Sequence, residues 1–286
     1  MTDQPRWLPL DGAANARDLG GLPTDRGAET VPHRLLRSDN LQGLTPSDVR
    51  LLVDDVRLRT VVDLRTDVEV ELEGPGPLIR EPRVEIRHLS LFPESGGRTD
   101  VDADSTLPWQ ADGEDARRGS ALPETPPGTP PDQPPEPGSR AVAFYLAYLR
   151  DRPDNIVAAL RAIADSDGAV LVHCAAGKDR TGVVVALALA AAGVPADRIV
   201  ADYVATAERM VPLMARLRAS ETYREDLDSR PDDSNRPRAE TMWRFLDILD
   251  EQYGGALGWL AGAGFGPADV ARLRARLVPA TIPAGD

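Results

Sequence analysis

The residues of this chain with the clearest chemical potential stand together in one short stretch, His173-Cys174-Ala175-Ala176-Gly177-Lys178-Asp179-Arg180-Thr181-Gly182. Cys174 is the only cysteine of the chain, and a lone thiol acts as a nucleophile only when it is held as the thiolate. Arg180 can turn back toward this sulfur and offer its guanidinium fork to two oxygens of a phosphate group. The residue types and their spacing therefore predict attack by a sulfur on phosphorus.

The neighbouring segments predict how this stretch is held in place. Residues 169–172 are a short apolar run, and residues 183–190 are apolar at a length typical of a buried helix. The loop between them would end a strand and begin a helix, where backbone N–H groups are unpaired and the helix dipole favours an anion. Gly177 lets the backbone turn, and Thr181 is expected to donate its hydroxyl to the sulfur. We therefore expect a phosphate cradle at this point.

Two other interpretations of the stretch fit it poorly. A buried structural cysteine beside a chance arginine would not be followed by so polar a loop. A Walker-type nucleotide loop would need glycine at Val172 and a serine or threonine at Asp179.

Two motifs carry a resemblance to a known family. Cys-x5-Arg with histidine before and threonine after it resembles the signature of the cysteine-dependent protein tyrosine phosphatases. The string Asn15-Ala16-Arg17-Asp18-Leu19-Gly20-Gly21 is by itself typical of a polar turn. It is, however, similar to the N-terminal motif of a bacterial and fungal branch of that family, which includes a mycobacterial phosphatase, and Leu35-Leu36-Arg37-Ser38-Asp39 continues the pattern.

The resemblance covers nearly the whole chain and implies a fold and a reaction. The implied fold is α/β, a central and mostly parallel sheet flanked by helices, in one phosphatase domain over residues 1–286. The implied reaction is hydrolysis of phosphate monoesters through a phosphocysteine on Cys174, with Arg180 on the phosphate. Asp179 lies inside the cradle, and the resemblance implies that it is the general acid; Asp63 is the alternative.

Asp63 and Arg65 stand at the carboxyl end of a strand predicted over residues 60–65. They could be a structural ion pair at the sheet edge, or they could line the phosphate cleft. His173 is expected to orient the junction of strand and loop rather than bind a metal, because His33 and His88 show no ligand spacing with it. The full set of predicted substrate contacts is Ala175, Ala176, Gly177, Lys178, Thr181, His173, Asp63 and Arg65.

Neither a metal ion nor a cofactor is predicted. Activity should therefore survive EDTA and fail with vanadate or thiol alkylation.

The predicted substrates are phosphotyrosine proteins or small phosphomonoesters, with broad specificity. Lys178 supports an alternative, phosphoinositides, whose phosphatases typically carry a further lysine directly after the cysteine, where this chain has Ala175. Two alternatives come from other classes: a phosphate-binding module without turnover, and a sulfur-transfer domain of the rhodanese type. Hydrolysis of para-nitrophenyl phosphate separates these from a phosphatase.

Composition limits the partners and the compartment. A formal net charge of −13 over 286 residues argues against nucleic acid or an anionic membrane as the main partner. One cysteine allows no disulfide framework, which fits a reducing cytosol. The polar first ten residues are unlike a signal peptide, and the apolar run at 183–192 is too short for a transmembrane segment. We expect a cytoplasmic protein, with export by a route without a cleaved signal left open.

One region breaks the globular pattern. Residues from about 91 to 140 are acidic and rich in proline, so they are predicted to be a disordered insertion or a loose flap where the resembling branch carries a lid; Trp109 is its one large anchor. Elsewhere, helices are predicted over 46–58, with Thr45 as the N-cap, and over 67–71, 141–149, 155–164, 199–210, 240–253 and 267–277; strands are predicted over 60–65, 84–89 and 169–172, and an exposed loop over 229–238.

Overall fold

The structure is a computed structural model that describes residues 5–74, 76–92, 139–228 and 235–279. Most of the predicted proline-rich insertion, with Trp109, and the first part of the predicted loop at 229–238 lie outside the described residues. At the approximate edges of this insertion, Leu91 is fully buried and helix α5 begins at Ser139.

A six-stranded sheet forms the centre of the fold. Its strands are β1 (Arg6–Trp7), β2 (Arg17–Asp18), β3 (Leu35–Ser38), β4 (Leu58–Asp63), β5 (Glu85–His88) and β6 (Ala169–His173). Their spatial order is β1-β2-β3-β6-β4-β5. The four strands from β3 to β5 in that order are parallel, and β1 and β2 are added antiparallel beside β3. The predicted α/β fold with a mostly parallel sheet is confirmed.

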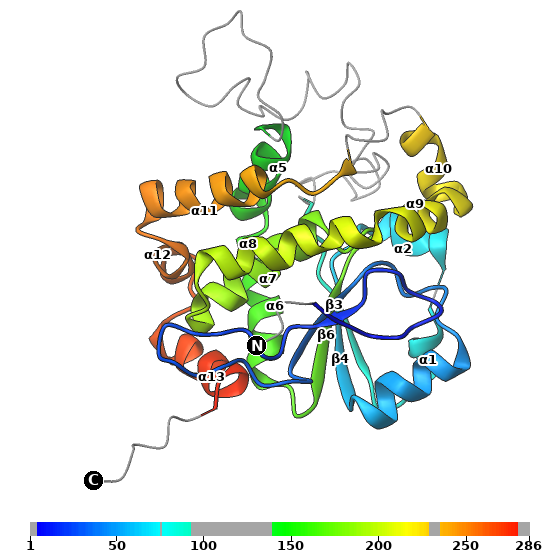
Figure 1. Ribbon diagram of the computed structural model, residues 1–286, viewed down its shortest axis with the longest axis horizontal. Helices are drawn as coiled ribbons and strands as arrows, with labels where there is room; N and C mark the ends of the chain where they lie inside the picture. The colour runs from blue at the N-terminus through cyan, green and yellow to red at the C-terminus, as the bar shows by residue number, and fades with distance from the viewer. Residues whose placement is uncertain (1–4, 75, 93–138, 229–234, 280–286) are drawn as a thin grey trace, which may run out of the picture.

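The central position of β6 follows from its sequence. All five of its residues are buried, and alternate side chains point to opposite faces of a strand. Val170 and Val172 belong to the large core on one face, whereas Ala169 and Leu171 belong to a smaller core on the other. Helices α6, α7 and α13 lie on the first face and α1 on the second, as Figure 1 shows. Because β6 is covered on both sides, the loop at its carboxyl end is held firmly.

Helical segments connect and cover the strands. They are α1 (Pro46–Arg50), a π-helix (Leu51–Asp55), α2 (Asp67–Glu73), a 3-10 helix (Pro77–Arg80), α5 (Ser139–Asp151), α6 (Pro153–Asp165), α7 (Asp179–Ala192), α8 (Ala196–Ala205), a 3-10 helix (Thr206–Arg209), α9 (Met210–Ala219), α10 (Glu221–Asp228), α11 (Ala239–Tyr253), α12 (Ala256–Gly262) and α13 (Pro267–Leu277).

Two predicted helices differ from the structure for local reasons. The helix predicted over 46–58 begins at Pro46 with Thr45 as its N-cap, as expected, but it stops at Asp55, because Arg57 adopts a positive φ of 60° and Leu58 already belongs to β4. The helix predicted over 199–210 is divided, because a 3-10 turn at Thr206–Arg209 separates α8 from α9.

Helices α9 and α10 pack over the loop that follows β6. A separate apolar cluster joins Ala175 of the loop to Leu213 and Leu217 of α9 and to Tyr223 and Leu227 of α10. Through this cluster, α9 and α10 cover the loop.

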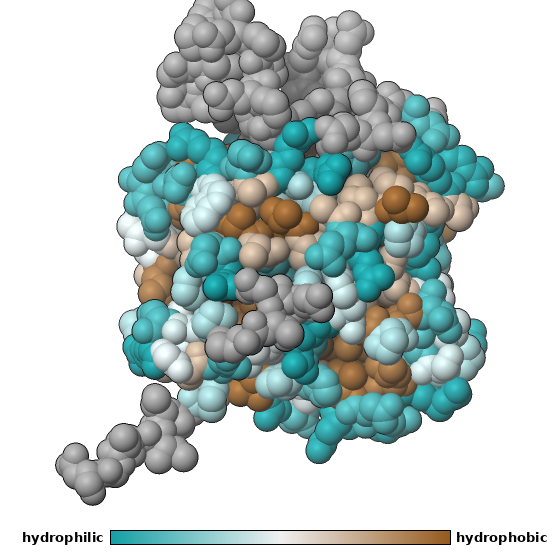
Figure 2. Space-filling model, in the orientation of Figure 1, coloured by the Kyte–Doolittle hydropathy of each residue, from teal (hydrophilic) through white to brown (hydrophobic). Residues whose placement is uncertain are grey.

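On the face drawn in Figure 2, hydrophobic residues form patches between polar ones rather than one continuous surface.

Candidate active site

The loop between β6 and α7 has the geometry of an anion cradle. Gly177 has φ of +65°, and a Cβ at this position would collide with the carbonyl group of Ser38, so only glycine fits. Within the described residues, the backbone N–H groups of residues 175–178 donate to no other group. These N–H groups stand just before the N-terminus of α7, where a negative charge is stabilised.

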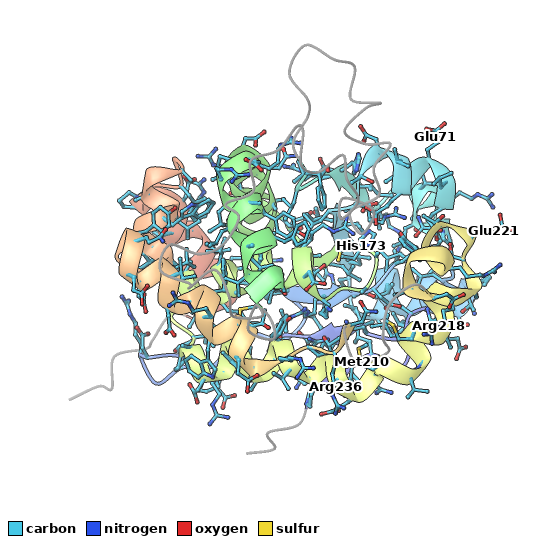
Figure 3. The ribbon with its side chains drawn as sticks, turned by 90° about the horizontal axis from the view of Figure 1, so that it is seen from above. Glu71, His173, Met210, Arg218, Glu221 and Arg236 are labelled. Carbon is cyan, nitrogen blue, oxygen red and sulfur yellow. The ribbon has the colours of Figure 1, made fainter. Side chains whose placement is uncertain are left out.

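Cys174 lies at the start of this cradle and is only 2% exposed. Arg180 and Tyr148 are near enough to interact electrostatically with it. Figure 3 looks down on this end of the molecule and shows His173, the residue before the cysteine, near the middle, with Arg218 of α9 and Glu221 of α10 farther out. The sulfur therefore belongs to the interior of the site and not to the outer surface.

Arg180 is held by Glu69, a residue absent from the predicted site. Its Nη1 and Nη2 atoms donate to Glu69 Oε2 at 2.6 Å and Oε1 at 2.9 Å, and Nη1 also donates to the Leu64 carbonyl oxygen at 3.2 Å. Burial alone would raise the pKa of Glu69, but Arg180, together with the Thr66 N–H and Arg65, outweighs it and holds that pKa below its usual range. The carboxylate therefore fixes the guanidinium in one orientation.

The pairing with Glu69 leaves part of the Arg180 fork available. A guanidinium carries five N–H donors, and the three bonds to Glu69 and Leu64 use three of them. Among the described residues, two donors remain that could reach phosphate oxygens. The ring of Phe92 lies 5.7 Å from the guanidinium carbon and supports it by a cation–π contact.

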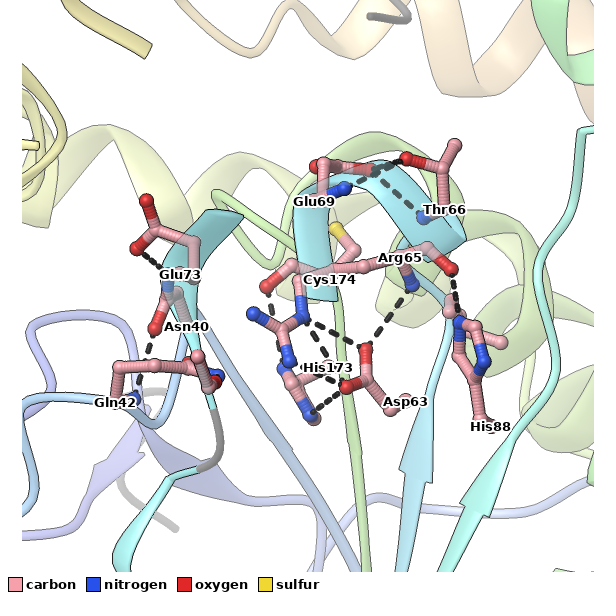
Figure 4. Close-up of polar contacts among 12 residues, drawn as sticks. Asn40, Gln42, Asp63, Arg65, Thr66, Glu69, Glu73, His88, His173 and Cys174 are labelled. Atoms are coloured by element: carbon pink, nitrogen blue, oxygen red, sulfur yellow. Dashed lines mark hydrogen bonds and ion pairs between the residues drawn. The ribbon is translucent and has the colours of Figure 1, made fainter. Parts of the chain in front are cut away.

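Asp63 and Arg65 form a buried ion pair beside the cradle. Arg65 Nη2 donates to Asp63 Oδ2 at 2.6 Å and Nε donates to Oδ1 at 2.9 Å, as Figure 4 shows. Burial would raise the pKa of Asp63, but the neighbouring His173 and the Arg65 fork outweigh it and hold that pKa far below its usual range. Asp63 is therefore ionised at neutral pH, and a carboxylate in that state has no proton to donate.

His173 contacts both this ion pair and the cradle. Its Nδ1 lies 3.2 Å from the Cys174 carbonyl oxygen, and its Nε2 lies 3.6 Å from Asp63 Oδ2. Burial lowers the pKa of His173 to about 4, although Asp63 acts in the opposite direction. The ring is therefore neutral at physiological pH and serves as a spacer between strand and loop.

Acidification is expected to lower stability through His173. The unfolded ring has a pKa of about 6.5, against about 4 in the folded protein. Between these values the unfolded chain binds more protons, so the free energy of unfolding falls as the pH falls. From pH 7 to pH 5 the contribution of His173 should amount to about 2 kcal/mol. Urea unfolding at both pH values measures it, and His173→Gln should reduce the difference by that amount; an unchanged difference would contradict the assignment.

Asp179 directly follows the cradle as the first residue of α7, and its side chain is 35% exposed. The hydroxyl of Tyr145 donates to Asp179 Oδ1 at 2.6 Å and lies 2.9 Å from the hydroxyl of Tyr203. Lys178 Nζ lies 3.4 Å from Asp179 Oδ2 and donates to the Asn235 carbonyl oxygen at 2.8 Å. Tyr145, whose hydroxyl also contacts that of Tyr203, thus orients a carboxylate that still reaches solvent.

Thr181 does not make the bond expected from the sequence. Its hydroxyl oxygen is buried and has no hydrogen-bond partner among the described residues, so it does not donate to Cys174 in this structure. The remaining predicted contacts, Ala175, Ala176 and Gly177, form the wall of the cradle with their backbone.

Glu69 could have been found only in part from the sequence. Thr66-x-x-Glu69 has the pattern of a capping box, and both of its hydrogen bonds are present at the start of α2. That pattern explains the position of Glu69 but not its bond to Arg180, which joins residues 111 positions apart.

In the described ranges there is no group of three or more His, Cys, Asp and Glu side chains suited to a metal ion.

Comparison with known proteins agrees with this geometry. Residues 8–279 match the model of the tyrosine phosphatase family. The chain is 31% identical to the triple specificity protein phosphatase PtpB of Mycobacterium tuberculosis, over 94% of this chain and 98% of that protein. It is 29% identical to a tyrosine-protein phosphatase of Nostoc commune, over 89% of this chain and 78% of that one. The chain belongs to the tyrosine phosphatase family, as its two motifs predicted.

Family membership decides the class of activity. The protein is an enzyme, a protein-tyrosine phosphatase that hydrolyses phosphate monoesters through a phosphocysteine intermediate. The alternatives of a binding module without turnover and of a sulfur-transfer domain are thereby set aside. None of the helices in the described parts of the chain has the length and apolar character needed to cross a bilayer.

Proposed function

We propose that Cys174, Arg180 and Asp179 carry the reaction. The thiolate of Cys174 attacks phosphorus, the bond from phosphorus to the leaving oxygen breaks, and Asp179 gives that oxygen its proton. Water then attacks the phosphocysteine, Asp179 takes the proton of the water, and the thiolate is released with inorganic phosphate. The two remaining donors of Arg180 and the N–H groups of residues 175–178 hold the nonbridging oxygens throughout.

The cradle itself is the observation that supports this proposal most strongly. Four successive N–H groups without a partner among the described residues lie between a buried cysteine and a guanidinium of fixed orientation. Hydrogen-bond donors that are already in place stabilise the charge of the transition state without being reorganised during the reaction. These contacts are suited to a phosphoryl group.

The geometry favours Asp179 over Asp63 as the general acid. Asp63 is ionised and bound by the Arg65 fork, so its proton is absent at neutral pH. Asp179 directly follows the cradle and is partly exposed, which suits a group that gives a proton to a departing oxygen. Asp63, Arg65 and His173 then support the base of the cradle rather than contact the substrate.

Asp179→Asn tests this assignment. The substitution should lower kcat about 10²-fold or more for phosphotyrosine, whose leaving oxygen needs a proton. The loss should be smaller for para-nitrophenyl phosphate, whose leaving group is a weak base, and the high-pH limb of the kcat profile should flatten. Asp197→Asn, an exposed aspartate on α8, is the matched control. An unchanged profile in Asp179→Asn would contradict the assignment of Asp179 as the general acid.

We propose broad specificity, with phosphotyrosine proteins and small phosphomonoesters as first substrates. The M. tuberculosis relative is named for three specificities, which supports a tolerant site. Phosphoinositides are the second candidate, and Lys178 is the residue that favours them. Its Nζ, however, already donates to Asn235 and lies close to Asp179, so its charge is partly engaged. Turnover of phosphopeptides and phosphoinositides measured side by side distinguishes the two.

A further inference from the structure

Three successive carbonyl groups of the cradle are held from behind by side chains of the N-terminal region. Asn15 Nδ2 donates to the Ala176 carbonyl oxygen at 2.9 Å and to that of Gly177 at 3.3 Å. Arg37 Nη2 donates to the Gly177 carbonyl oxygen at 2.6 Å and to that of Lys178 at 3.4 Å. Asn15 is fully buried and Arg37 is 1% exposed, so water cannot replace these bonds.

The two side chains are themselves fixed by a buried ionic group. Asp202 of α8 accepts from Arg17 Nε at 2.8 Å and from Arg37 Nη1 at 2.5 Å. Arg17 Nη1 in turn donates to Asn15 Oδ1 at 2.6 Å. Burial lowers the pKa of Arg17 to about 10, against the effect of Asp202, so the guanidinium stays charged at neutral pH. We call these four residues, Asn15, Arg17, Arg37 and Asp202, the brace.

The brace has a direct consequence for the N–H groups of the cradle. A peptide unit is planar and trans, so its C=O and the following N–H point in opposite directions. Bonds that hold the carbonyl groups of residues 176, 177 and 178 toward the brace therefore turn the N–H groups of residues 177, 178 and 179 the other way. That direction is toward the space in which the proposed function places the phosphate.

We propose that Asn15 and Arg37 are positioning residues of the phosphatase reaction. They touch no substrate, and they act by aiming the N–H groups of the cradle at the transferred phosphoryl group. This inference rests on the proposed function of the cradle. It also gives a physical task to the N-terminal motif, whose Asn15 and Arg17 lie far from Cys174 in the sequence.

The test compares Asn15→Ala, Arg37→Lys and Arg37→Met with the wild-type enzyme. Asn15→Ala removes the amide donors to the loop together with the oxygen that accepts from Arg17, and Arg37→Lys keeps the charge but cannot join Asp202 and Gly177 at once. Because a misplacement of about 1 Å can cost about 10²-fold in rate, kcat for para-nitrophenyl phosphate should fall by roughly that factor in Asn15→Ala, with KM much less changed. Vanadate, which resembles the transition state, should lose affinity by a similar factor, whereas inorganic phosphate should lose less.

A control and a second variant keep this test decisive. Asp269→Ala removes a buried cap of α13 that also pairs with Arg161, so it should lower the melting temperature but leave kcat and vanadate affinity unchanged. If Arg37→Met does not fold, Asn15→Ala and Arg37→Lys carry the comparison. Folded variants with kcat and vanadate affinity within about threefold of the wild type would overturn the inference. Turnover that survives Cys174→Ser would instead contradict the proposed function itself.

Discussion

Replacing Cys174 with serine is expected to lower kcat by at least about 10⁴-fold, the scale seen when a nucleophile is removed from an assembled site. A serine hydroxyl is far less acidic than a thiol, so it cannot supply an anion at the start of the cradle. The cradle N–H groups and Arg180 remain, and a phosphotyrosine peptide should still bind.

Turnover of para-nitrophenyl phosphate and peptide binding, both measured on purified Cys174→Ser, check this expectation. Binding retained with turnover lost assigns the chemistry to the sulfur. A serine variant within about tenfold of the wild-type rate would show that another group attacks phosphorus.

Arg180→Lys is expected to lower kcat by about 10³-fold, as is usual when an arginine on a transferring phosphoryl group is lost. Lysine keeps the charge, but it is a point donor that cannot bind Glu69 and two phosphate oxygens together. The measurement is kcat and KM for para-nitrophenyl phosphate, with the melting temperature as a check of folding.

Glu69→Gln is the matched variant for this second prediction. It keeps the shape of the side chain but removes the charge that orients Arg180, which stays buried at 5% exposure. Breaking a buried ion pair from one side typically costs about 3–5 kcal/mol, so the free energy of unfolding should fall more than it does in Arg180→Lys. Equal kinetic constants in Glu69→Gln and the wild type would show that Arg180 needs no fixed orientation.

The local part of the site could be predicted from the sequence. The strand, loop and helix around Cys174 follow from apolar runs on either side of a polar loop. Helix α13 begins at Pro267 and ends at Leu277 as predicted, because proline at its start and a regular apolar spacing are local signals. The mostly parallel sheet was implied by resemblance, and residues distant in the sequence supply its neighbouring strands.

The contacts that orient the site could not be predicted in this way. Glu69 meets Arg180 across 111 residues, and Asn15 meets Ala176 across 161. Polar side chains such as these are indistinguishable from solvated ones until the fold brings them together. That α9 and α10 cover the loop could not be predicted either, because a 3-10 turn follows α8 and interrupts the helical spacing of the sequence.

The most direct measurement is a search for the covalent intermediate. The enzyme would be mixed with a phosphotyrosine peptide, quenched in acid within one turnover, digested and analysed by mass spectrometry. We predict one phosphoryl group on Cys174 in the wild type, a longer-lived signal in Asp179→Asn because activation of the attacking water is impaired, and none in Cys174→Ser. Rapid turnover with Cys174 unmodified at every time point, or with the phosphoryl group on another residue, would contradict the account.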